Sequence, residues 1–137
     1  MITKKRYEAF KKTCDEKFSG INLTTLNVLN SEEAELATNK MLAKDTDVIF
    51  CMSDEILVGV MKCVQKKKLK IPKDISIISI SNGFFPKLYY PEITYVETSG
   101  YKLGKNAFEC MLACLNGSTF VHNIVTDCIL VGGGSLS

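Results

Sequence analysis

Small polar residues directly follow an apolar stretch in the middle of the chain. Residues 75–80 read ISIISI, and Ser81, Asn82 and Gly83 come next. An apolar run of this length is typical of a strand buried on both faces of a parallel sheet, and open parallel sheets bind ligands beyond the carboxyl ends of their strands. The pattern therefore indicates either a ligand cleft that uses Ser81 and Asn82, or only a turn, for which Asn and Gly supply the backbone freedom.

A second polar pair, Ser53 and Asp54, follows the apolar run 47–52, DVIFCM. The periodicity then changes to that of a helix extending to about residue 68, so the pair lies at a helix amino terminus. Backbone N–H groups at such a terminus point toward bound polar or anionic groups. Asp54 is thus a candidate ligand contact, and it is at least as well explained as an acidic residue that caps the helix.

Apolar strands alternate with helices along most of the chain. This alternation is typical of β-α-β units and predicts an α/β fold, an open parallel sheet with helices on both faces. We find no internal repeat and no low-complexity linker. Helices are expected at residues 3–18, 31–44, 54–68 and 101–115, strands at 21–29, 47–52, 75–80 and 93–97, one or two strands at 120–131, and an aromatic loop at 84–92.

The expected helix 54–68 is apolar over more than the single stripe that a helix lying on a sheet normally buries. Either it is deeply embedded within one chain, or it offers a second contact surface, most simply a two-fold dimer interface. Gly59 costs about 1 kcal/mol relative to alanine inside a helix, which is more tolerable where another backbone packs closely. Two aromatic residues of the following loop either join this interface or only cover the sheet edge. The candidate interface residues are Leu57, Val58, Met61, Phe85 and Tyr89.

The composition is that of an ordinary soluble domain. Hydrophobic residues make up 46% of the 137 residues and charged residues 23%, and 17 basic against 15 acidic residues give a net charge of +2. This small charge creates no overall field that would attract nucleic acid or a membrane surface. We see no apolar run near the roughly 20 residues of a membrane span and no secretory signal in the opening residues.

The six cysteines form no C-x-x-C pair, and the only histidine is His122. Cys110 and Cys114 lie one helical turn apart, an arrangement that would hold a metal only if further ligands converged. We interpret the cysteines as small buried hydrophobic residues and expect no metal, no cofactor and a reducing, cytoplasmic environment. Since no nucleophile and base stand in a recognisable arrangement, and no G-x-S-x-G or G-x-G-x-x-G follows a strand, we do not expect an enzyme.

The order of these signals resembles the ligand-binding core of the lac repressor/galactose repressor (LacI/GalR) family of bacterial transcription regulators. The likeness rests on DVIFCMSDEILVGVMKCVQKKKLKIPKDISIISISNG (47–83), on YYPEITYVETSGYKLGKNAFECML (89–112) and on the opening KKRYEAF (4–10). Each motif alone is weak, but together, in this order and spacing, they cover nearly the whole chain.

The resemblance implies a partial effector-binding and dimerisation domain over residues 1–137. The family has a two-lobed, periplasmic-binding-protein-like core, and residues 1–95 and 118–131 correspond to its second, carboxyl-terminal lobe. Residues 96–117 correspond to a segment that crosses into the first lobe, and that lobe and the DNA-binding helix-turn-helix are expected to be absent from this chain. We therefore expect the helix 101–115 to pack unusually or to be supplied to a partner chain.

The resemblance also implies which residues hold the effector. Family members grip polar groups with an arginine at the place of Arg6, whose five donors suit hydroxyl pairs, carboxylates or phosphates; without a ligand, Arg6 would be explained by a surface ion pair. They also use residues at Ser53 and Ser81, and Thr98 lies where the chain crosses between lobes. The acid usual at Ser81 is here a hydroxyl with Asn82 beside it, and the arginine expected in the last strand is replaced within 132–134. These departures weaken the case for a plain sugar held by a carboxylate and favour an anionic or modified ligand, or weak binding.

Taken together, we predict the effector-binding and dimerisation module of a LacI-type regulator. Its effector would be carbohydrate-like, its partner a second copy, and its contact with DNA would pass through the absent helix-turn-helix; no membrane partner is expected. The alternative is a sugar- or solute-binding protein of a transport system, which shares the two-lobed fold. Six cysteines and the lack of a visible signal argue against that alternative.

Overall fold

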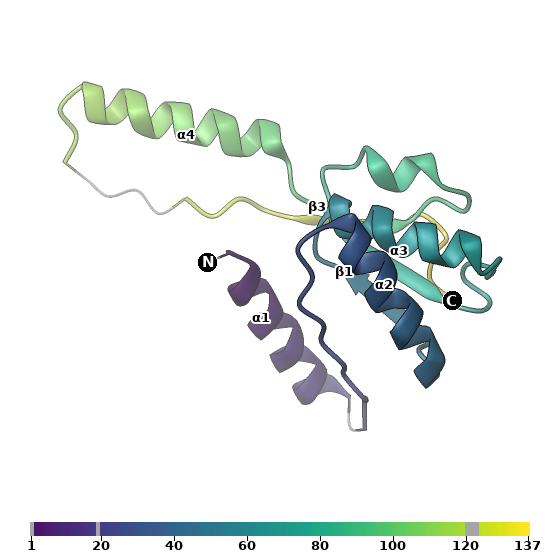
Figure 1. Cartoon of the computed structure of the whole chain (residues 1–137). Helices are drawn as coiled ribbons and strands as arrows, with labels where there is room; N and C mark the ends of the chain where they lie inside the picture. The colour runs from purple at the N-terminus through teal and green to yellow at the C-terminus, as the bar shows by residue number, and fades with distance from the viewer. Residues whose placement is uncertain (1, 19, 120–123) are drawn as a thin grey trace.

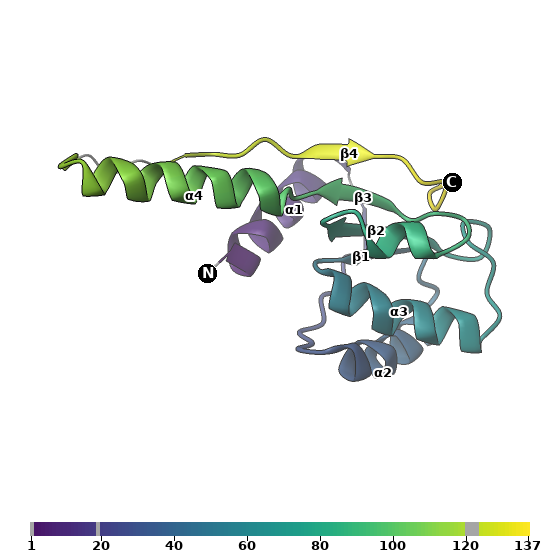
Figure 2. The ribbon, with the colours of Figure 1, turned by 90° about the horizontal axis from the view of Figure 1, so that it is seen from above.

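The computed structural model describes residues 2–18, 20–119 and 124–137, and its centre is a four-stranded sheet with the order β1-β2-β3-β4. The first three strands pair in parallel, and β4 pairs with β3 in the antiparallel direction (Figure 2). The open α/β fold is thus confirmed, but the expectation of a wholly parallel sheet is wrong for the last strand. The strands are β1 (Val48–Cys51), β2 (Ser76–Ser81), β3 (Thr94–Glu97) and β4 (Ile129–Val131).

Helices lie on both faces of the sheet, as expected (Figures 1 and 2). On one face, α3 contacts the strands and α2 packs against α3. On the other face, α1 meets the sheet through Phe10, whose ring centroid lies 4.7 Å from that of Phe50 in β1. No helix among the described residues is long and apolar enough to cross a membrane. The helices that cover the sheet are α1 (Ile2–Lys17), α2 (Ser31–Met41) with the short 3-10 turn η1 (Leu42–Lys44), and α3 (Asp54–Lys66).

The broad apolar surface of α3 is buried within its own chain. Leu57 is completely inaccessible and Met61 nearly so, because α3 is enclosed by the sheet on one side and by α2 on the other. The embedded-helix interpretation is therefore correct for these two residues, and neither can offer surface to a partner. The core cluster comprises Ile49, Cys51, Leu57, Val60, Met61, Val64, Ile75, Ile77 and Ile93.

The contact between α2 and α3 depends on small residues. A Cβ atom at Gly59 would lie 2.1 Å from the backbone oxygen of Ser31 and 2.7 Å from the Cβ of Ala34. Ala34 and Thr38 form the buried face of α2, and the Thr38 hydroxyl donates to the Ala34 carbonyl at 2.7 Å. The backbone that packs on Gly59 is thus that of α2 and not that of a second copy.

Residues 21–29 form no strand, contrary to the sequence-based expectation. The apolar residues Ile21 and Leu23 are spaced by two, but the next, Leu26, falls on the opposite parity. Because the side chains of a strand alternate between its faces, such a slip leaves no continuous apolar face to bury. Ile21 and Leu26 are indeed exposed.

The helix α4 (Gly100–Leu115) projects away from the sheet, as Figures 1 and 2 both show. None of its residues is buried, and apolar side chains such as Leu103 and Met111 are exposed. The returning segment touches α4 through a hydrogen bond from Asn106 Nδ2 to Thr126 Oγ1 at 3.3 Å. We call the described residues 100–119 and 124–128 the arm, and this arm is attached to the sheet mainly by β3 and β4.

The remaining expectations are met in part. The aromatic loop contains a short 3-10 turn, η2 (Phe85–Leu88), in which Pro86 is buried. In the described part of the range 120–131, where one or two strands were expected, residues 129–131 form β4 and residues 124–128 form no strand. Residues 120–123, including His122, lie outside the described residues.

We predict that Gly59→Ala lowers the free energy of unfolding by up to about 2 kcal/mol. The added methyl group must push α2 away from α3, a strain that typically costs 1–3 kcal/mol and exceeds the helix-propensity gain of about 1 kcal/mol. Urea denaturation followed by circular dichroism measures the change. Gly104→Ala in α4 is the matched control, because a Cβ there meets nothing within 4 Å; it should be neutral or stabilising, and equal losses in the two variants would contradict the packing argument.

Candidate ligand-binding edge

The polar residues singled out in the sequence lie at one edge of the sheet. Because β1, β2 and β3 are parallel, Ser53 after β1, Ser81 at the end of β2 and Thr98 after β3 all belong to the same carboxyl edge. The Thr98 backbone N–H donates to the Ser81 carbonyl oxygen at 2.9 Å, and the Thr98 hydroxyl approaches the same oxygen at 3.4 Å. Ser81 and Thr98 are therefore in direct contact.

The segment Ser81-Asn82-Gly83 forms a turn. The Ser81 hydroxyl accepts a hydrogen bond from the Gly83 N–H at 2.9 Å, and the Asn82 side-chain oxygen accepts one from the Phe84 N–H at 3.1 Å. Gly83 has φ +96°, which favours glycine, and a Cβ there would lie 2.9 Å from the Tyr95 hydroxyl oxygen, so a larger residue would have to displace the Tyr95 side chain. Ser81 is buried and already bonded, whereas Asn82 is exposed and keeps its amide NH₂ group as a donor.

Ser53 is the residue that caps the amino terminus of α3. The sequence had left open whether Asp54 has this capping role or contacts a ligand. The Ser53 hydroxyl accepts from the Ile56 N–H at 3.4 Å, and the Ser53 backbone is extended, as at other helix amino termini. Asp54 is the first residue of the helix, and its Oδ1 atom is buried without a hydrogen-bond partner among the described residues. A buried carboxylate oxygen is costly unless a donor reaches it, so Asp54 is chemically suited to accept a hydrogen bond from a ligand hydroxyl.

Arg6 lies in the second turn of α1, and its side chain is half-buried. The amino-terminal end of α1 is on the side of the sheet toward which the parallel strands point (Figure 2). Within the described part of the chain, Arg6 has no salt-bridge partner, so the surface ion pair considered as its alternative role is not formed there. In that same part, the hydrogen bonds of the Ser53, Ser81 and Thr98 side chains are made with backbone groups and not with Arg6.

The cysteines are free, and the one nearest this edge is inert. Cys51 ends β1, two residues before Ser53, and burial raises the pKa of its thiol to about 12. Since the thiolate is the reactive form of cysteine, this thiol cannot act as a nucleophile near neutral pH. Only Cys51 and Cys63 are buried, whereas Cys114 and Cys128 are exposed, so the interpretation of the cysteines as buried hydrophobic residues is wrong for these last two.

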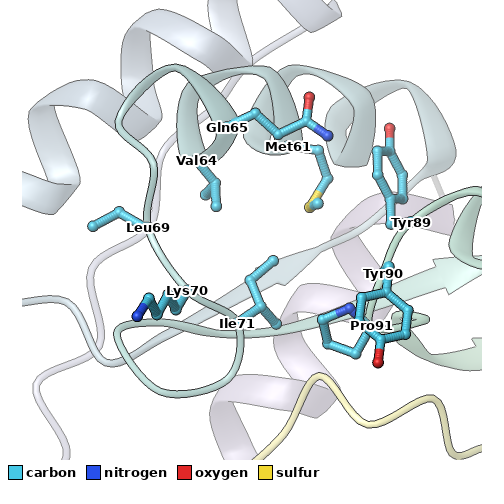
Figure 3. A pocket seen from close by; sticks show the side chains of 9 residues that line it. All are labelled: Met61, Val64, Gln65, Leu69, Lys70, Ile71, Tyr89, Tyr90 and Pro91. Carbon is cyan, nitrogen blue, oxygen red and sulfur yellow. The ribbon is translucent and has the colours of Figure 1, made fainter.

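A cavity of about 410 Å³ lies at the other end of α3, away from the polar edge (Figure 3). In Figure 3, Met61 and Gln65 of α3 face Ile71 of the following loop, with Tyr89 and Tyr90 at one side. Sequence reasoning did not identify this cavity, although Tyr89 was a candidate interface residue. Burial raises the pKa of the Tyr89 hydroxyl. The lining residues are Met61, Val64, Gln65, Leu69, Lys70, Ile71, Tyr89, Tyr90 and Pro91.

Comparison with known proteins identifies the family. A family model described as a periplasmic binding protein-like domain matches residues 2–136. The HTH-type transcriptional repressor PurR of Pasteurella multocida is 32% identical over 117 residues, covering 82% of this chain and 35% of that protein. The HTH-type transcriptional regulator RegA of Clostridium acetobutylicum is 24% identical over 96 residues, covering 69% and 29%. The chain thus spans about a third of the length of these relatives.

Solved structures agree on the fold. The crystal structure of the transcription regulator CcpA of Lactococcus lactis has a TM-score of 0.84 at 22% identity, covering 98% of this chain and 51% of that one. A LacI family transcriptional regulator from Enterococcus faecium, solved with bound ribose, has a TM-score of 0.87 at 19% identity, covering 96% and 50%.

The sheet, its flanking helices and the family match define a chain of the periplasmic binding protein-like class, and the chain belongs to that family. Its relatives assign it, more narrowly, to the effector-binding domain of the LacI/GalR regulators, which confirms the resemblance seen in the sequence. These relatives are transcriptional regulators, so the expectation that the chain is not an enzyme is also confirmed.

We predict that Ser53→Ala destabilises the chain by about 1 kcal/mol, because α3 loses the acceptor for its Ile56 N–H group. Ser53→Asn keeps an acceptor at this position and should retain most of the stability. The midpoint of urea unfolding, compared at equal m-value, measures both effects. Equal losses in the two variants would mean that the hydroxyl is needed for something other than capping.

Proposed function

We propose that this chain is one lobe of a LacI-type effector-binding domain that senses a carbohydrate-like small molecule. The observation that carries this proposal is the convergence of polar groups at the carboxyl edge of β1, β2 and β3. There the Thr98–Ser81 hydrogen bonds join two strand ends, and the buried Oδ1 atom of Asp54 has no hydrogen-bond partner in the described part of the chain. A ligand hydroxyl would relieve the cost of that oxygen.

The chemistry of this edge suits a polyhydroxy ligand. Asp54 would accept hydrogen bonds, the Asn82 amide would donate, and Thr98 would do either. Arg6, free of a salt bridge within the described part of the chain, would supply a fixed fork of donors to a hydroxyl pair or an anionic group. Ribose in the Enterococcus faecium regulator and lactose in an Arthrobacter LacI family regulator support a sugar or sugar derivative.

The arm fits the proposed division of the chain into lobe segments. Residues 1–95 and 118–131 would form the second lobe, and residues 96–117 would cross into the first. The exposed apolar side of α4 would be covered there, because such a surface is normally buried against another element. Packing of α4 against its own sheet in solution would argue against this division.

Regulation would follow from lobe closure. A ligand that bridges the two lobes favours the closed arrangement by its difference in affinity for the two states. The coupled output would be DNA binding through a helix-turn-helix outside this chain, in keeping with the HTH-type names of the relatives. Such a protein would work in the cytoplasm. A solute-binding protein of a transport system is the alternative, and the regulatory relatives favour the regulator.

We further propose that two copies associate through the surface beside the cavity of Figure 3. Val58 and Phe85 are half-buried, and Tyr89 lines the cavity. Tyr90, at its rim, is fully exposed, and a phenol ring of this kind is a common anchor at protein interfaces. Of the five candidate interface residues, the interface would thus use Val58, Phe85 and Tyr89, since Leu57 and Met61 belong to the core.

Ribose binding should be detectable by NMR. We expect titration of the ¹⁵N-labelled chain to shift the amide signals of Asp54, Asn82 and Thr98, with a dissociation constant of about 1–10 mM because a one-sided edge buries little of the ligand. Arg6→Ala should weaken binding about tenfold. Lys12→Ala, on the same helix in a surface ion pair with Glu16, should leave it unchanged. If shifts were absent from this edge across pentoses, hexoses and their phosphates, the proposed function would be wrong.

Dimerisation should be sensitive to Val58→Asp and Tyr89→Ala. Each change should raise the dissociation constant of a dimer measured by sedimentation velocity by about tenfold or more, because charge or lost contact area at an interface centre is costly. Leu103→Ser with Met111→Ser tests association through α4. A dimer lost only in this second variant would show that the arm, and not the α3 surface, joins the copies.

A further inference from the structure

The last six residues, 132–137, cross the amino-terminal end of the sheet and connect β4 with β2, which are not neighbours in the sheet. We call this segment the strap. β4 pairs only with β3, yet the strap continues from β4 as far as β2. Its end is held there by a hydrogen bond from the Ser137 N–H to the Ser76 hydroxyl at 3.4 Å.

Ser135 is the centre of the strap and is completely buried. Its hydroxyl accepts from the Thr94 N–H of β3 at 2.7 Å and donates to the Ile77 carbonyl of β2. Its own carbonyl accepts from the Ile77 N–H at 3.0 Å. One serine thus bridges the first residues of two neighbouring strands, and its hydroxyl and carbonyl groups are bonded to backbone groups of both strands.

The approach of the strap to the sheet also depends on glycine. The Gly133 N–H donates to the Thr94 hydroxyl at 3.1 Å, and a Cβ at Gly133 would lie 2.4 Å from the Glu92 carbonyl oxygen. Gly134 has φ +90°, a conformation that favours glycine. By contrast, a Cβ at Gly132 would meet nothing within 4 Å.

β4 has little else to hold it. It is three residues long, Ile129 and Leu130 are exposed, and it lies at the edge of the sheet. The arm depends on this strand, because α4 has no buried residue and the arm is joined to the sheet by β3 before residue 100 and by β4 after residue 128. Whatever fixes β4 to β2 therefore fixes the base of the arm.

We propose that Ser135 is a positioning residue that clamps β3 and β4 to β2 and thereby sets the direction of the arm relative to the candidate ligand edge. The clamp acts from the end of the sheet opposite to the ligand. Its relevance to effector sensing rests on the proposed function, in which the arm leads into the other lobe. The clamp itself is a property of this chain without any ligand.

Native-state hydrogen exchange of the full 137-residue chain, without ligand, tests the clamp. In the wild type, the amides of Ile77 and Thr94 should exchange as slowly as those in the β1–β2 ladder. In Ser135→Ala and in Gly133→Ala, the amides of Thr94 and of β4 should exchange at least about tenfold faster, while those of α2 and α3 change about twofold or less. Gly132→Ala is the matched control and should match the wild type.

Residual dipolar couplings give a readout that a loss of general stability would not reproduce. In the wild type and in Gly132→Ala, one alignment tensor should fit both α3 and α4. In Ser135→Ala and Gly133→Ala, the α4 couplings should be scaled down relative to those of α3, because the base of the arm is loosened. If Ser135→Ala does not fold, Ser135→Cys, which keeps a side chain of the same shape but has a larger and weaker hydrogen-bonding atom, takes its place in both measurements.

Several outcomes would overturn the clamp: fast exchange at Thr94 in the wild type, a uniform rise in exchange across α2 and α3, or an α4 that already reorients independently in the wild type. These outcomes are separable from failure of the proposed function. Loss of ribose binding would leave the exchange pattern intact, whereas a failed clamp would leave the chemical-shift titration at Asp54 and Asn82 unaffected.

Discussion

The parallel pairing of β1, β2 and β3 is the constraint on which the rest of the structure depends. It brings three strand ends to one edge, so that residues far apart in the sequence become neighbours, as Thr98 and Ser81 do through their hydrogen bonds. Parallel strands need covered faces, and α3 supplies the cover on one side with its apolar residues buried between the sheet and α2. That burial in turn requires α2 to approach α3 closely, which only a glycine at position 59 permits. A polar edge and an apolar helix are thus two consequences of the same strand arrangement.

The two ends of the sheet serve different purposes. At the carboxyl end, side chains are short, polar and only partly satisfied, with Asp54 as the clearest case. At the amino end, the strap meets the strands with a dense set of hydrogen bonds around Ser135. An effector-binding lobe needs this asymmetry, because groups that are saturated by their own chain have nothing to offer a ligand, whereas groups that hold strands in register must be saturated.

Much of the fold was predictable from the sequence because its signals are local. The apolar runs at 47–52 and 75–80, the capping Ser53 and the helical periodicity of 101–115 each describe a nearby stretch of chain, and the structure reproduces them closely. The failures concern pairing between distant segments. Residues 21–29 are rich in β-forming residues but lose their alternation at Leu26, and the direction of β4 depends on where the arm returns. The embedding of Leu57 depends on α2, which periodicity within α3 cannot reveal.

For the candidate site too, some features could be predicted from the sequence and others could not. The positions of Ser53, Ser81 and Thr98 at one edge could be deduced from the order of strands, but the turn hydrogen bonds of Ser81 and the orphaned oxygen of Asp54 could not, because they depend on side-chain geometry. Ser135 carried no signal at all: a serine after three glycines looks like a flexible end. Only the structure shows that its hydroxyl occupies a gap between two backbones.

The way in which the arm is attached has a mechanical consequence. Both strands at its base point along the same axis, since β3 leaves toward α4 and β4 returns from it antiparallel to β3. The hydrogen bonds that hold β3 to β2 run across this axis, so a pull on the arm loads them together in shear instead of opening them one at a time. A joint of this kind resists stretching and yields more easily to bending. In the two-lobed protein proposed above, the arm would therefore transmit rotation of the other lobe while keeping the distance between the lobes fixed.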